Sequence, residues 1–286
     1  MKHILVTGAN GQLGKTFQEI ASQYPGYQFT FTDVDELNIT DADAVNQYLG
    51  AQTFDACINC AAYTAVDKAE ADEDNAFLLN FQAPLFLAEA CSNQGTQYIH
   101  ISTDYVFDGK ACVPYTEEDD ASPSTIYGSS KMRGEAAALS ANPSTVVIRT
   151  SWLYSKYGVN FVSRMQELMA EKESLSIVFD QVGTPTYALD LAKAILSMLD
   201  FKYEKLDEIG GIYHYSNEGV ASWYDFAVAI KSLSGSQCKL EPITSEAYPT
   251  AAERPSYSVL NKGKIKNVFG LEIPYWKDSL QACIGK

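Results

Sequence analysis

Short runs of apolar and β-branched residues alternate with longer segments of helical periodicity along the first half of the chain. The strand-like runs read HILVTG, QFTFTD, ACINCAA, YIHIST and TVVIRTSW, and amphipathic segments such as NAFLLNFQAPLFLAEACSNQG lie between them. Strands that alternate with helices are typical of crossover units, in which a parallel sheet is covered on both faces. The pattern therefore predicts a doubly wound, Rossmann-like α/β domain over residues 1–150.

The alternation loosens after residue 151. The later pattern predicts a helix near 160–172, a strand at LSIVFDQ and a helix near 189–199, followed by aromatic segments that contain prolines. The chain shows no linker of disordered composition and no internal repeat. We expect residues 151–286 to form mainly a smaller substrate-binding lobe, with part of 175–200 returning to the first domain.

Composition limits the classes of partner. A chain of 286 residues with 46% hydrophobic residues can bury a large core, and its formal net charge of -15 repels polyanions, which argues against a nucleic-acid partner. An anionic ligand must be held locally, by helix N-termini or by a few cations. No apolar run approaches the length of a membrane span, and the start MKHILVTGANG lacks a signal-peptide pattern. These features predict a cytoplasmic protein without a membrane partner.

The cysteines are scattered rather than arranged as a disulfide framework, which favours reduced thiols. Cys57 and Cys60 form a C-x-x-C pair, but they lie inside the apolar run FDACINCAAY, without a second pair at metal-binding spacing. A buried strand is favoured there over a redox or zinc site. The sequence predicts no metal site.

The first chemical motif is VTGANGQLG, residues 6 to 14. Gly8, Gly11 and Gly14 follow the first predicted strand and open the first helix, where a pyrophosphate can approach bare backbone at a helix N-terminus. Asp33 ends the second strand, where a carboxylate can bond the hydroxyls of an adenosine ribose. The alternative is a glycine-rich turn next to an unrelated aspartate. The context of strand, turn and helix favours a dinucleotide site.

The second chemical motif combines STDYVFDG with IYGSSK. Thr103 stands at the end of an apolar strand, and Tyr127 and Lys131 are four positions apart on one face of a predicted helix. An ammonium near a phenol favours the phenolate and lowers the phenol pKa. Tyr127 is then suited to protonate a carbonyl oxygen that Thr103 also hydrogen-bonds. The alternative is an exposed tyrosine beside a solvated lysine, with no catalytic role.

These motifs carry a resemblance to a known superfamily. TGANGQLG, STDYVFDG and YGSSK resemble the extended short-chain dehydrogenases/reductases, whose catalytic set is Ser/Thr, Tyr and Lys. More narrowly, AAYTAVDKAE, STDYVFDG, RTSWLY, DQVGTPT and AERPSYSVLN are similar, in order and over essentially the full length, to the dTDP-4-dehydrorhamnose reductase family. That family uses NADPH or NADH to reduce the 4-keto group of dTDP-4-dehydro-L-rhamnose, so the resemblance implies a nucleotide-sugar substrate.

The resemblance also implies site residues. The catalytic set is Thr103, Tyr127 and Lys131. Residues expected to contact the cofactor lie mainly in the glycine loop, at and after the end of the second strand, and in the segment AAYT: Gly8, Gly11, Gln12, Leu13, Gly14, Asp33, Asn38, Ile39, Ala62, Tyr63, Thr64, Tyr127 and Lys131. Residues expected to contact the substrate are Thr64, Val66, Thr103, Asp104, Trp152, Asn160 and Arg254. Trp152 has an alternative role as a core aromatic, and Arg254 as a surface ion pair with Glu253 or another acid.

Two other functions share parts of this pattern. A nucleotide-sugar epimerase or dehydratase has the same Tyr and Lys but regenerates its cofactor, and a regulatory subunit of methionine adenosyltransferase binds the dinucleotide without turnover. Some family members dimerise through metal-bridged glutamates, but Lys15, Thr16 and Phe17 stand where we would expect one of them. A homodimer is left open, as is the role of Asn80.

Overall fold

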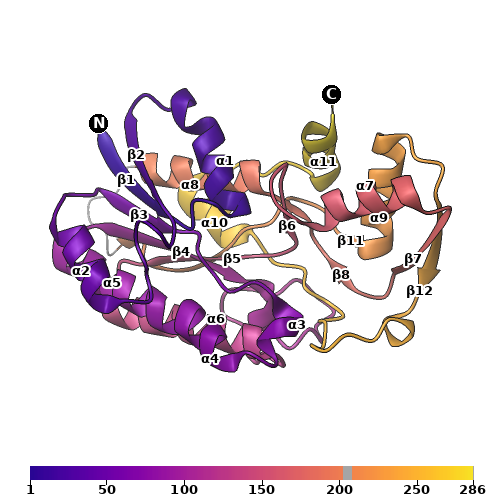
Figure 1. Ribbon diagram of the computed structural model, residues 1–286, viewed down its shortest axis with the longest axis horizontal. Helices are drawn as coiled ribbons and strands as arrows, with labels where there is room; N and C mark the ends of the chain where they lie inside the picture. Colours follow the sequence, from indigo (N-terminus) through magenta and orange to yellow (C-terminus); the bar gives the residue numbers. More distant parts are fainter. Residues whose placement is uncertain (202–207, 286) are drawn as a thin grey trace.

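Six parallel strands form the central sheet of the computed structural model, which describes residues 1–201 and 208–285. Their order is β2–β1–β3–β4–β5–β10, so the chain adds one strand beside β1 and then crosses over to build the other side (Figure 1). Ligands of open parallel sheets bind beyond the carboxyl ends of the strands at such a reversal. The strands are β1 (Lys2–Thr7), β2 (Tyr27–Thr32), β3 (Ala56–Asn59), β4 (Gln97–Thr103), β5 (Val146–Thr150) and β10 (Gly211–His214).

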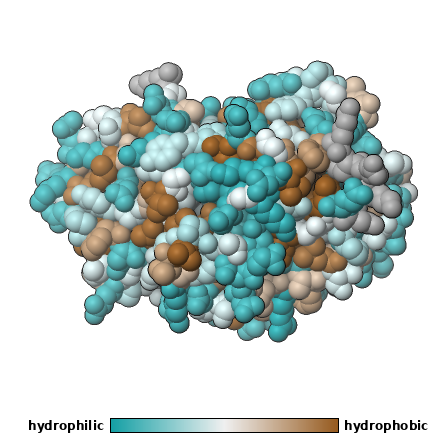
Figure 2. All heavy atoms as spheres, turned by 180° about the vertical axis from the view of Figure 1, so that it is seen from behind, coloured by the Kyte–Doolittle hydropathy of each residue, from teal (hydrophilic) through white to brown (hydrophobic). Residues whose placement is uncertain are grey.

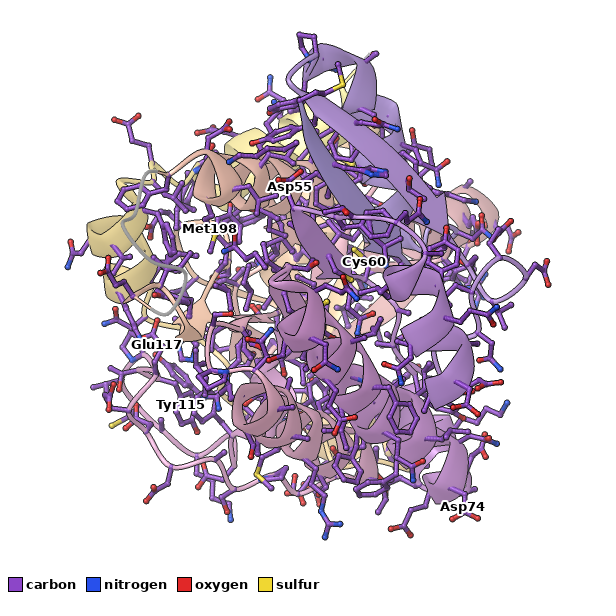
Figure 3. The ribbon with its side chains drawn as sticks, turned by 90° about the vertical axis from the view of Figure 1, so that its left-hand side faces the viewer. Asp55, Cys60, Asp74, Tyr115, Glu117 and Met198 are labelled. Carbon is purple, nitrogen blue, oxygen red and sulfur yellow. The ribbon has the colours of Figure 1, made fainter. Side chains whose placement is uncertain are left out.

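The strands are apolar because the sheet is buried on both faces. Ile4 and Val6 pack into the core on one face, and Leu5, between them, packs into the core on the other; all three are fully buried. Figure 3 views the molecule from another side, with Asp55 just before β3 and Cys60 just after it. These two residues mark the opposite ends of that strand, and Cys60 marks the end at which ligands bind.

Helices cover both faces of the sheet (Figure 1). Apolar residues of α1 (Gln12–Ile20), α8 (Ala188–Asp200) and α10 (Gly263–Phe269) form one core with the sheet. Those of α2 (Ala42–Gly50), α5 (Ala83–Gln94) and α6 (Ile126–Ala141) form the second. The fold is the doubly wound α/β architecture predicted from the sequence.

A π-helical turn interrupts the long helical segment before β4. The segment runs from α4 (Glu73–Phe77) through the π turn η2 (Leu78–Gln82) into α5. Gly134 of α6 lies so close to this turn that an added Cβ would come within 2.0 Å of the Asn80 carbonyl oxygen. The turn therefore brings the buried Asn80 against the helix that carries Tyr127 and Lys131.

A smaller lobe lies beside the carboxyl ends of the strands (Figure 1). Its core includes Tyr154, Met165, Phe226 and Trp276, all buried. Its elements are β6 (Leu153–Tyr154), α7 (Phe161–Glu171), β7 (Ser174–Val178), β8 (Val182–Gly183), β9 (Thr186–Tyr187), β11 (Ala221–Ser222), α9 (Trp223–Ser234), β12 (Lys239–Ile243) and α11 (Trp276–Ile284).

Short elements complete the described part of the chain. Polar residues cover most of the face seen in Figure 2, and apolar side chains are scattered among them.

In the described residues, no helix is long and apolar enough to cross a membrane. The short elements are η1 (Ala21–Gln23), α3 (Val66–Ala69), η3 (Asp104–Val106) and η5 (Ser245–Ala247).

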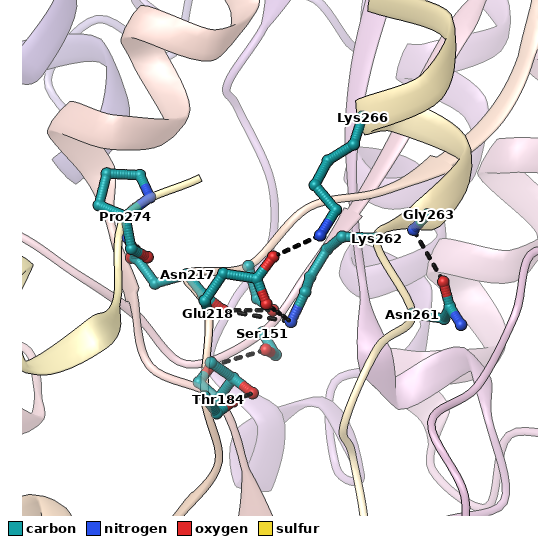
Figure 4. A network of polar contacts seen from close by, with 11 residues as sticks. Ser151, Thr184, Asn217, Glu218, Asn261, Lys262, Gly263, Lys266 and Pro274 are labelled. Carbon is teal, nitrogen blue, oxygen red and sulfur yellow. Dashed lines mark hydrogen bonds and ion pairs between the residues drawn. The ribbon is translucent and has the colours of Figure 1, made fainter. Parts of the chain in front are cut away.

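A polar network joins the segment after β10 to the last part of the chain (Figure 4). Lys266 donates to Glu218 at 2.8 Å, and Lys262 lies 3.4 Å from the other oxygen of that carboxylate. Asn217 donates to the carbonyl of Pro274 at 3.2 Å. The network fixes α10 and the approach to α11 against the sheet.

The five strands and two late helices predicted from the sequence are present, and LSIVFDQ includes all of β7 except its first residue, Ser174. The sixth strand, β10, was not predicted; it pairs with β5 through Gly211–His214. Both β10 and α10 lie on the central sheet, although their residues fall in the range expected to form mainly the smaller lobe. The chain thus leaves the lobe for the sheet twice, at α8 and β10 and again at α10, and ends in the lobe with α11.

Candidate active site

A cleft of about 1020 Å³ runs along the carboxyl ends of the strands and against the smaller lobe. Its walls come from the glycine loop, from the ends of β3 and β4, from α6 and from the lobe. All predicted site residues except Gly14 and Arg254 line it: Gly8, Gly11, Gln12, Leu13, Asp33, Asn38, Ile39, Ala62, Tyr63, Thr64, Val66, Thr103, Asp104, Tyr127, Lys131, Trp152 and Asn160.

The glycine loop requires its glycines for steric reasons. Gly8 has φ 66°, and an added Cβ would lie 2.5 Å from the Ala61 nitrogen. Gly14 lies behind the loop, where an added Cβ would meet the Gly8 carbonyl oxygen at 2.4 Å. Gly11 is the N-cap of α1 and has no side chain to occupy the first amide groups. The start of α1 therefore presents backbone donors that suit a diphosphate.

Asp33 closes the loop from the end of β2. One carboxylate oxygen accepts from the Asn10 amide at 2.8 Å and the other from the Val34 amide at 2.9 Å. None of the ion pairs formed by the described residues involves Asp33. Asn38 and Ile39 lie on the same part of the cleft, where the Asn38 side chain accepts from the Thr40 amide at 3.1 Å.

The segment after β3 is held by Asn80. Its side-chain oxygen accepts from the Tyr63 amide at 2.8 Å, and its nitrogen donates to the Tyr63 carbonyl and to the Ser130 hydroxyl, both at 3.0 Å. Ser130 in turn donates to the Tyr127 carbonyl at 2.8 Å. Asn80 is fully buried. It therefore connects the backbone beside Ala62 and Thr64 to the helix that carries Tyr127.

Thr103 and Tyr127 meet at the floor of the cleft. Thr125 caps α6 by accepting from the Gly128 amide at 3.0 Å, which places Tyr127 in the first turn of the helix. Thr103 hydrogen-bonds the Tyr127 phenol and donates to Asp104 at 3.0 Å. Burial raises the pKa of Tyr127 above its ordinary value, while the hydrogen bond with Thr103 opposes the shift. The phenol is therefore protonated at neutral pH.

Lys131 differs from the expectation that its ammonium lowers the pKa of Tyr127. Its Nζ donates to the Ile101 carbonyl at 2.5 Å and lies 3.4 Å from His100 Nε2. Burial lowers the pKa of Lys131 to about 8, and the charge of Glu135 opposes the shift. Burial of the phenol, rather than a neighbouring cation, dominates the pKa of Tyr127 in the structure.

The partners of Asn59 fix the tautomer of His100. The Asn59 carboxamide oxygen accepts from the Ala61 amide at 3.1 Å, so its nitrogen faces His100 Nδ1 at 3.3 Å. Burial lowers the pKa of His100 well below its ordinary value, and the charge of Lys131 acts in the same direction. The neutral ring thus accepts at Nδ1 and carries its proton on Nε2, toward Lys131. Such a contact favours the neutral amine of Lys131, as burial does.

Asp104 offers an acceptor to the cleft. It is 3% exposed, and its Oδ2 has no hydrogen-bond partner within residues 1–201 and 208–285. Burial raises its pKa to about 6, and interactions with the Thr103 and Ser258 side chains oppose the shift. A buried carboxylate with a free oxygen can accept from a ligand hydroxyl.

The lobe contributes Trp152 and Asn160 to the opposite side of the cleft. Trp152 is the one residue other than glycine with positive φ in the described chain, at 47°. Asn160 caps α7, accepting from the Val162 amide at 3.0 Å, and donates to the Ser155 carbonyl at 2.9 Å. Ser155 donates to Gln12 at 3.2 Å, so this loop contacts the glycine-loop helix across the cleft. Val66 begins α3 at the cleft margin.

Arg254 does not line the cleft. It forms an ion pair with Asp67 on α3 and donates to the Tyr105 hydroxyl at 3.3 Å. Tyr105 does line the cleft, and its ring contacts that of Tyr127 edge to face. Among the Lys and Arg residues that the structure describes, Lys131 alone lines the cleft. Arg254 therefore lies one residue away from the site, next to an acid.

Sequence reasoning missed Trp223, which lines the cleft and stacks on Trp152. The segment SWYDF, which contains Trp223, has no local signal of a ligand site. The contact could not be inferred, because the two tryptophans come from segments far apart in the chain.

The cysteines are free, and Cys57 lies in the buried strand β3 as expected. Cys60 lines the cleft, where burial raises its pKa beyond the ordinary range of a thiol. Within the described residues, no cluster of His, Cys, Asp and Glu has the arrangement of a metal site. On α1, Lys15 is exposed, whereas Thr16 and Phe17 are buried.

The chain is similar to known proteins over nearly its whole length. A family model described as RmlD substrate binding domain matches residues 1–286. The spore coat polysaccharide biosynthesis protein SpsK of Bacillus subtilis (strain 168) is 40% identical, over 98% of this chain and 96% of that protein. The dTDP-4-dehydrorhamnose reductase of Aggregatibacter actinomycetemcomitans is 37% identical over 98% of both chains. A solved structure of dTDP-4-dehydrorhamnose reductase from Bacillus anthracis str. Ames in complex with NADP has a TM-score of 0.94 and 37% identity, and 99% of each chain is covered.

Proposed function

The chain belongs to the RmlD substrate binding domain family, and on that premise we propose that it reduces the 4-keto group of dTDP-4-dehydro-L-rhamnose to give dTDP-L-rhamnose, using NADPH or NADH. One observation carries the proposal: Thr103, Tyr127 and Lys131 share a single cleft with a glycine loop whose helix N-terminus is open to a diphosphate. Proton donor, carbonyl-binding hydroxyl and dinucleotide site are thereby combined.

The cofactor lies along the glycine loop in this proposal. Backbone amides at Gly11, Gln12 and Leu13 receive the diphosphate, since no lysine or arginine of the described chain other than Lys131 lines the cleft. Asp33 accepts from the ribose hydroxyls, and Asn38 and Ile39 lie beside the adenine. Ala62, Tyr63 and Thr64 border the nicotinamide half, on backbone that Asn80 holds in place.

The reduced nicotinamide supplies the hydride when bound. Tyr127 donates its phenolic proton to the carbonyl oxygen of the sugar, and the raised pKa keeps that proton in place until the oxygen gains negative charge. Thr103 turns its hydroxyl proton away from Asp104 and donates a second hydrogen bond to the same oxygen. Lys131 acts below about pH 8 as an ammonium that stabilises the phenolate left behind.

The substrate lies between the strand ends and the lobe. Asp104 accepts from a sugar hydroxyl through its free oxygen. Trp152 packs against the sugar ring, with Thr64, Val66 and Asn160 at the margins. Arg254 approaches the diphosphate of the nucleotide sugar if it exchanges Asp67 for phosphate. A cytoplasmic location and a homodimer also belong to the proposal.

Both nicotinamide cofactors are expected to serve. Asp33 repels a 2′-phosphate, and Glu36, which accepts from the Asp33 amide at 2.9 Å, adds a second acid beside it. The family relatives include one solved with NADP. We expect NADH to remain within about 100-fold of NADPH in kcat/KM, because a larger ratio needs roughly 2.7 kcal/mol of discrimination from a cation at the 2′ position.

The test is a turnover assay with enzymatically generated dTDP-4-dehydro-L-rhamnose. We expect one equivalent of NADPH or NADH to be oxidised for each dTDP-L-rhamnose formed, with the product identified by chromatography and mass spectrometry. Conversion of the sugar with regeneration of the cofactor would instead assign an epimerase or dehydratase. Cofactor binding without turnover, together with co-purification of a synthetase, would assign a regulatory subunit.

A further inference from the structure

Trp152 is held in a backbone conformation that needs external support. Its φ of 47° lies in the left-handed region, which a large side chain rarely adopts. Such residues persist where the surrounding structure determines them, and they gather at ligand sites. Two hydrogen bonds hold the chain here: the Trp152 carbonyl accepts from the Thr186 amide at 3.2 Å, and the hydroxyl of the preceding Ser151 donates to the Thr184 carbonyl at 2.8 Å (Figure 4).

The indole ring of Trp152 is fixed on two sides. An added Cβ at Gly183 would lie 2.7 Å from Trp152 Cε2, so only glycine leaves room for the ring there. Trp223 stacks on Trp152 with a centroid separation of 3.5 Å and an interplanar angle of 6°. The face of Trp223 thus sets the plane of Trp152.

Trp223 is itself placed rigidly. It is the first residue of α9, after the N-cap Ser222, which forms a capping box with Asp225. Ser222 and Ala221 form β11, which pairs with Val182 and Gly183 of β8. Gly183, which makes room for the Trp152 ring, therefore lies in one strand of this pair, and Trp223, which stacks on that ring, directly follows the other.

We infer that Trp223 is a positioning residue that determines how the site accepts the sugar of the nucleotide-sugar substrate. Trp223 covers one face of the Trp152 ring and holds that ring parallel to itself, so the stacked pair presents its uncovered surface as an aromatic wall to the apolar C–H and methyl groups of a deoxysugar. Both rings line the cleft that contains Thr103 and Tyr127. This inference rests on the proposed function.

A purely structural role predicts something different. Trp223 also contacts Phe161 and Phe226 in the lobe core, with centroid separations of 4.6 and 6.4 Å. If those contacts were its only role, replacement would lower the melting temperature and leave the kinetics of the folded enzyme unchanged. If Trp223 positions Trp152, an aromatic replacement retains function and an aliphatic one of similar apolar character does not.

The test compares Trp223→Leu with Trp223→Phe. For Trp223→Leu we expect the KM for dTDP-4-dehydro-L-rhamnose to rise by at least about 10-fold, with the Kd for NADPH within about 2-fold of wild type. For Trp223→Phe, which keeps a ring that can stack, we expect the sugar KM to stay within about 3-fold of wild type. The matched control is Tyr224→Leu, on the next position of α9 and outside this cleft, which should leave both constants unchanged.

Circular dichroism reports the stack independently of turnover. Two indoles in parallel contact give an exciton couplet, which we expect in wild type and in Tyr224→Leu, and not in Trp223→Phe or Trp152→Phe. A sugar KM that is unchanged in Trp223→Leu, or raised equally in Trp223→Leu, Trp223→Phe and Tyr224→Leu, would overturn the inference while leaving the proposed function intact. A wild-type protein that neither reduces nor binds the nucleotide sugar would overturn the proposed function itself, whatever the couplet shows, and the inference with it.

Discussion

The two walls of the cleft differ in how their side chains are held. On the sheet wall, Thr103, Tyr127 and Lys131 are buried at the ends of β4 and α6, with hydrogen bonds that reach into the sheet. On the lobe wall, Trp152 and Trp223 are half-buried and hold each other by stacking. Burial on the first wall shifts pKa values, whereas the second wall presents apolar area.

This difference separates chemistry from recognition. A proton donor must keep its geometry within a fraction of an ångström, which a helix N-terminus and a strand end provide. A sugar is recognised by area and shape, which two rings from different segments can provide. Changes on the sheet wall should therefore act mainly on kcat, and changes on the lobe wall mainly on the sugar KM.

The largest effect is expected from the sheet wall. Tyr127→Phe should retain cofactor affinity but lose about 100- to 10,000-fold in kcat, because the positioned general acid is removed. Stopped-flow turnover and cofactor titration measure the two quantities. The control is Tyr105→Phe, which keeps the adjacent ring but removes a hydroxyl that bonds Arg254. A near-normal kcat in Tyr127→Phe would show that Tyr127 is not the proton donor.

The pH dependence of kcat/KM tests the role of Lys131 on the sheet wall. Burial lowers the pKa of Lys131 to about 8, whereas that of Tyr127 is raised above its ordinary value. We expect kcat/KM to fall about 10-fold per pH unit above roughly pH 8, as the ammonium loses its proton. The profile is measured with saturating cofactor and a range of sugar concentrations. A rate that stays level to pH 10 would show that the charge of Lys131 is not required.

Arg254 belongs to neither wall, so its replacement tests whether a residue outside both walls also contributes to substrate binding. Arg254→Ala should raise the sugar KM about 10-fold and leave NAD(P)H affinity unchanged, the scale of one charge-assisted hydrogen bond to phosphate. The matched control is Arg164→Ala, whose partner Glu167 lies on the exposed side of α7. If Asp67→Asn and Arg254→Ala have the same slight effect, the arginine serves only its ion pair with Asp67.

The smallest effect concerns stability. Burial raises the pKa of Asp104 from 3.8 to about 6, so the folded state binds this proton more tightly than the unfolded chain does. The resulting stabilisation is present below about pH 4 and is lost as the pH rises through about 6. Asp104→Asn carries no such charge, so its stability relative to wild type should improve by about 1 kcal/mol between pH 5 and pH 7.5. Urea unfolding at both pH values measures this change. If the difference in free energy of unfolding between Asp104→Asn and wild type is the same at both, the ionised carboxylate is exposed to water rather than buried.

Much of the sheet wall could be predicted because its signals are local. The apolar run before Thr103 and the spacing of Tyr127 and Lys131 identify a strand end and one face of a helix. The partners of Lys131 could not be predicted, because Ile101 and His100 reach it across the interface between α6 and the sheet. The π turn around Asn80 was equally hidden, since LLNFQ has the composition of an ordinary helix.

The lobe wall could be predicted only in part. Trp152 was identified through a resemblance that includes RTSWLY, whereas Trp223 has no such local signal. Its role depends on the pairing of β8 with β11, elements of two residues each that no periodicity reveals. The strand β10 was missed for a similar reason: GIYH is short and stands between glycine and a polar segment.

The return of the chain to the central sheet at β10 sets a rule for recombination between relatives. Trp152 precedes β10 in the sequence and Trp223 follows it, so the aromatic wall cannot be exchanged as one continuous segment. A chimera that swaps residues 151–187 alone would pair Trp152 with a foreign partner at position 223. To transplant substrate preference, a donor must supply the segments before and after β10 together, with the strand itself kept from the host.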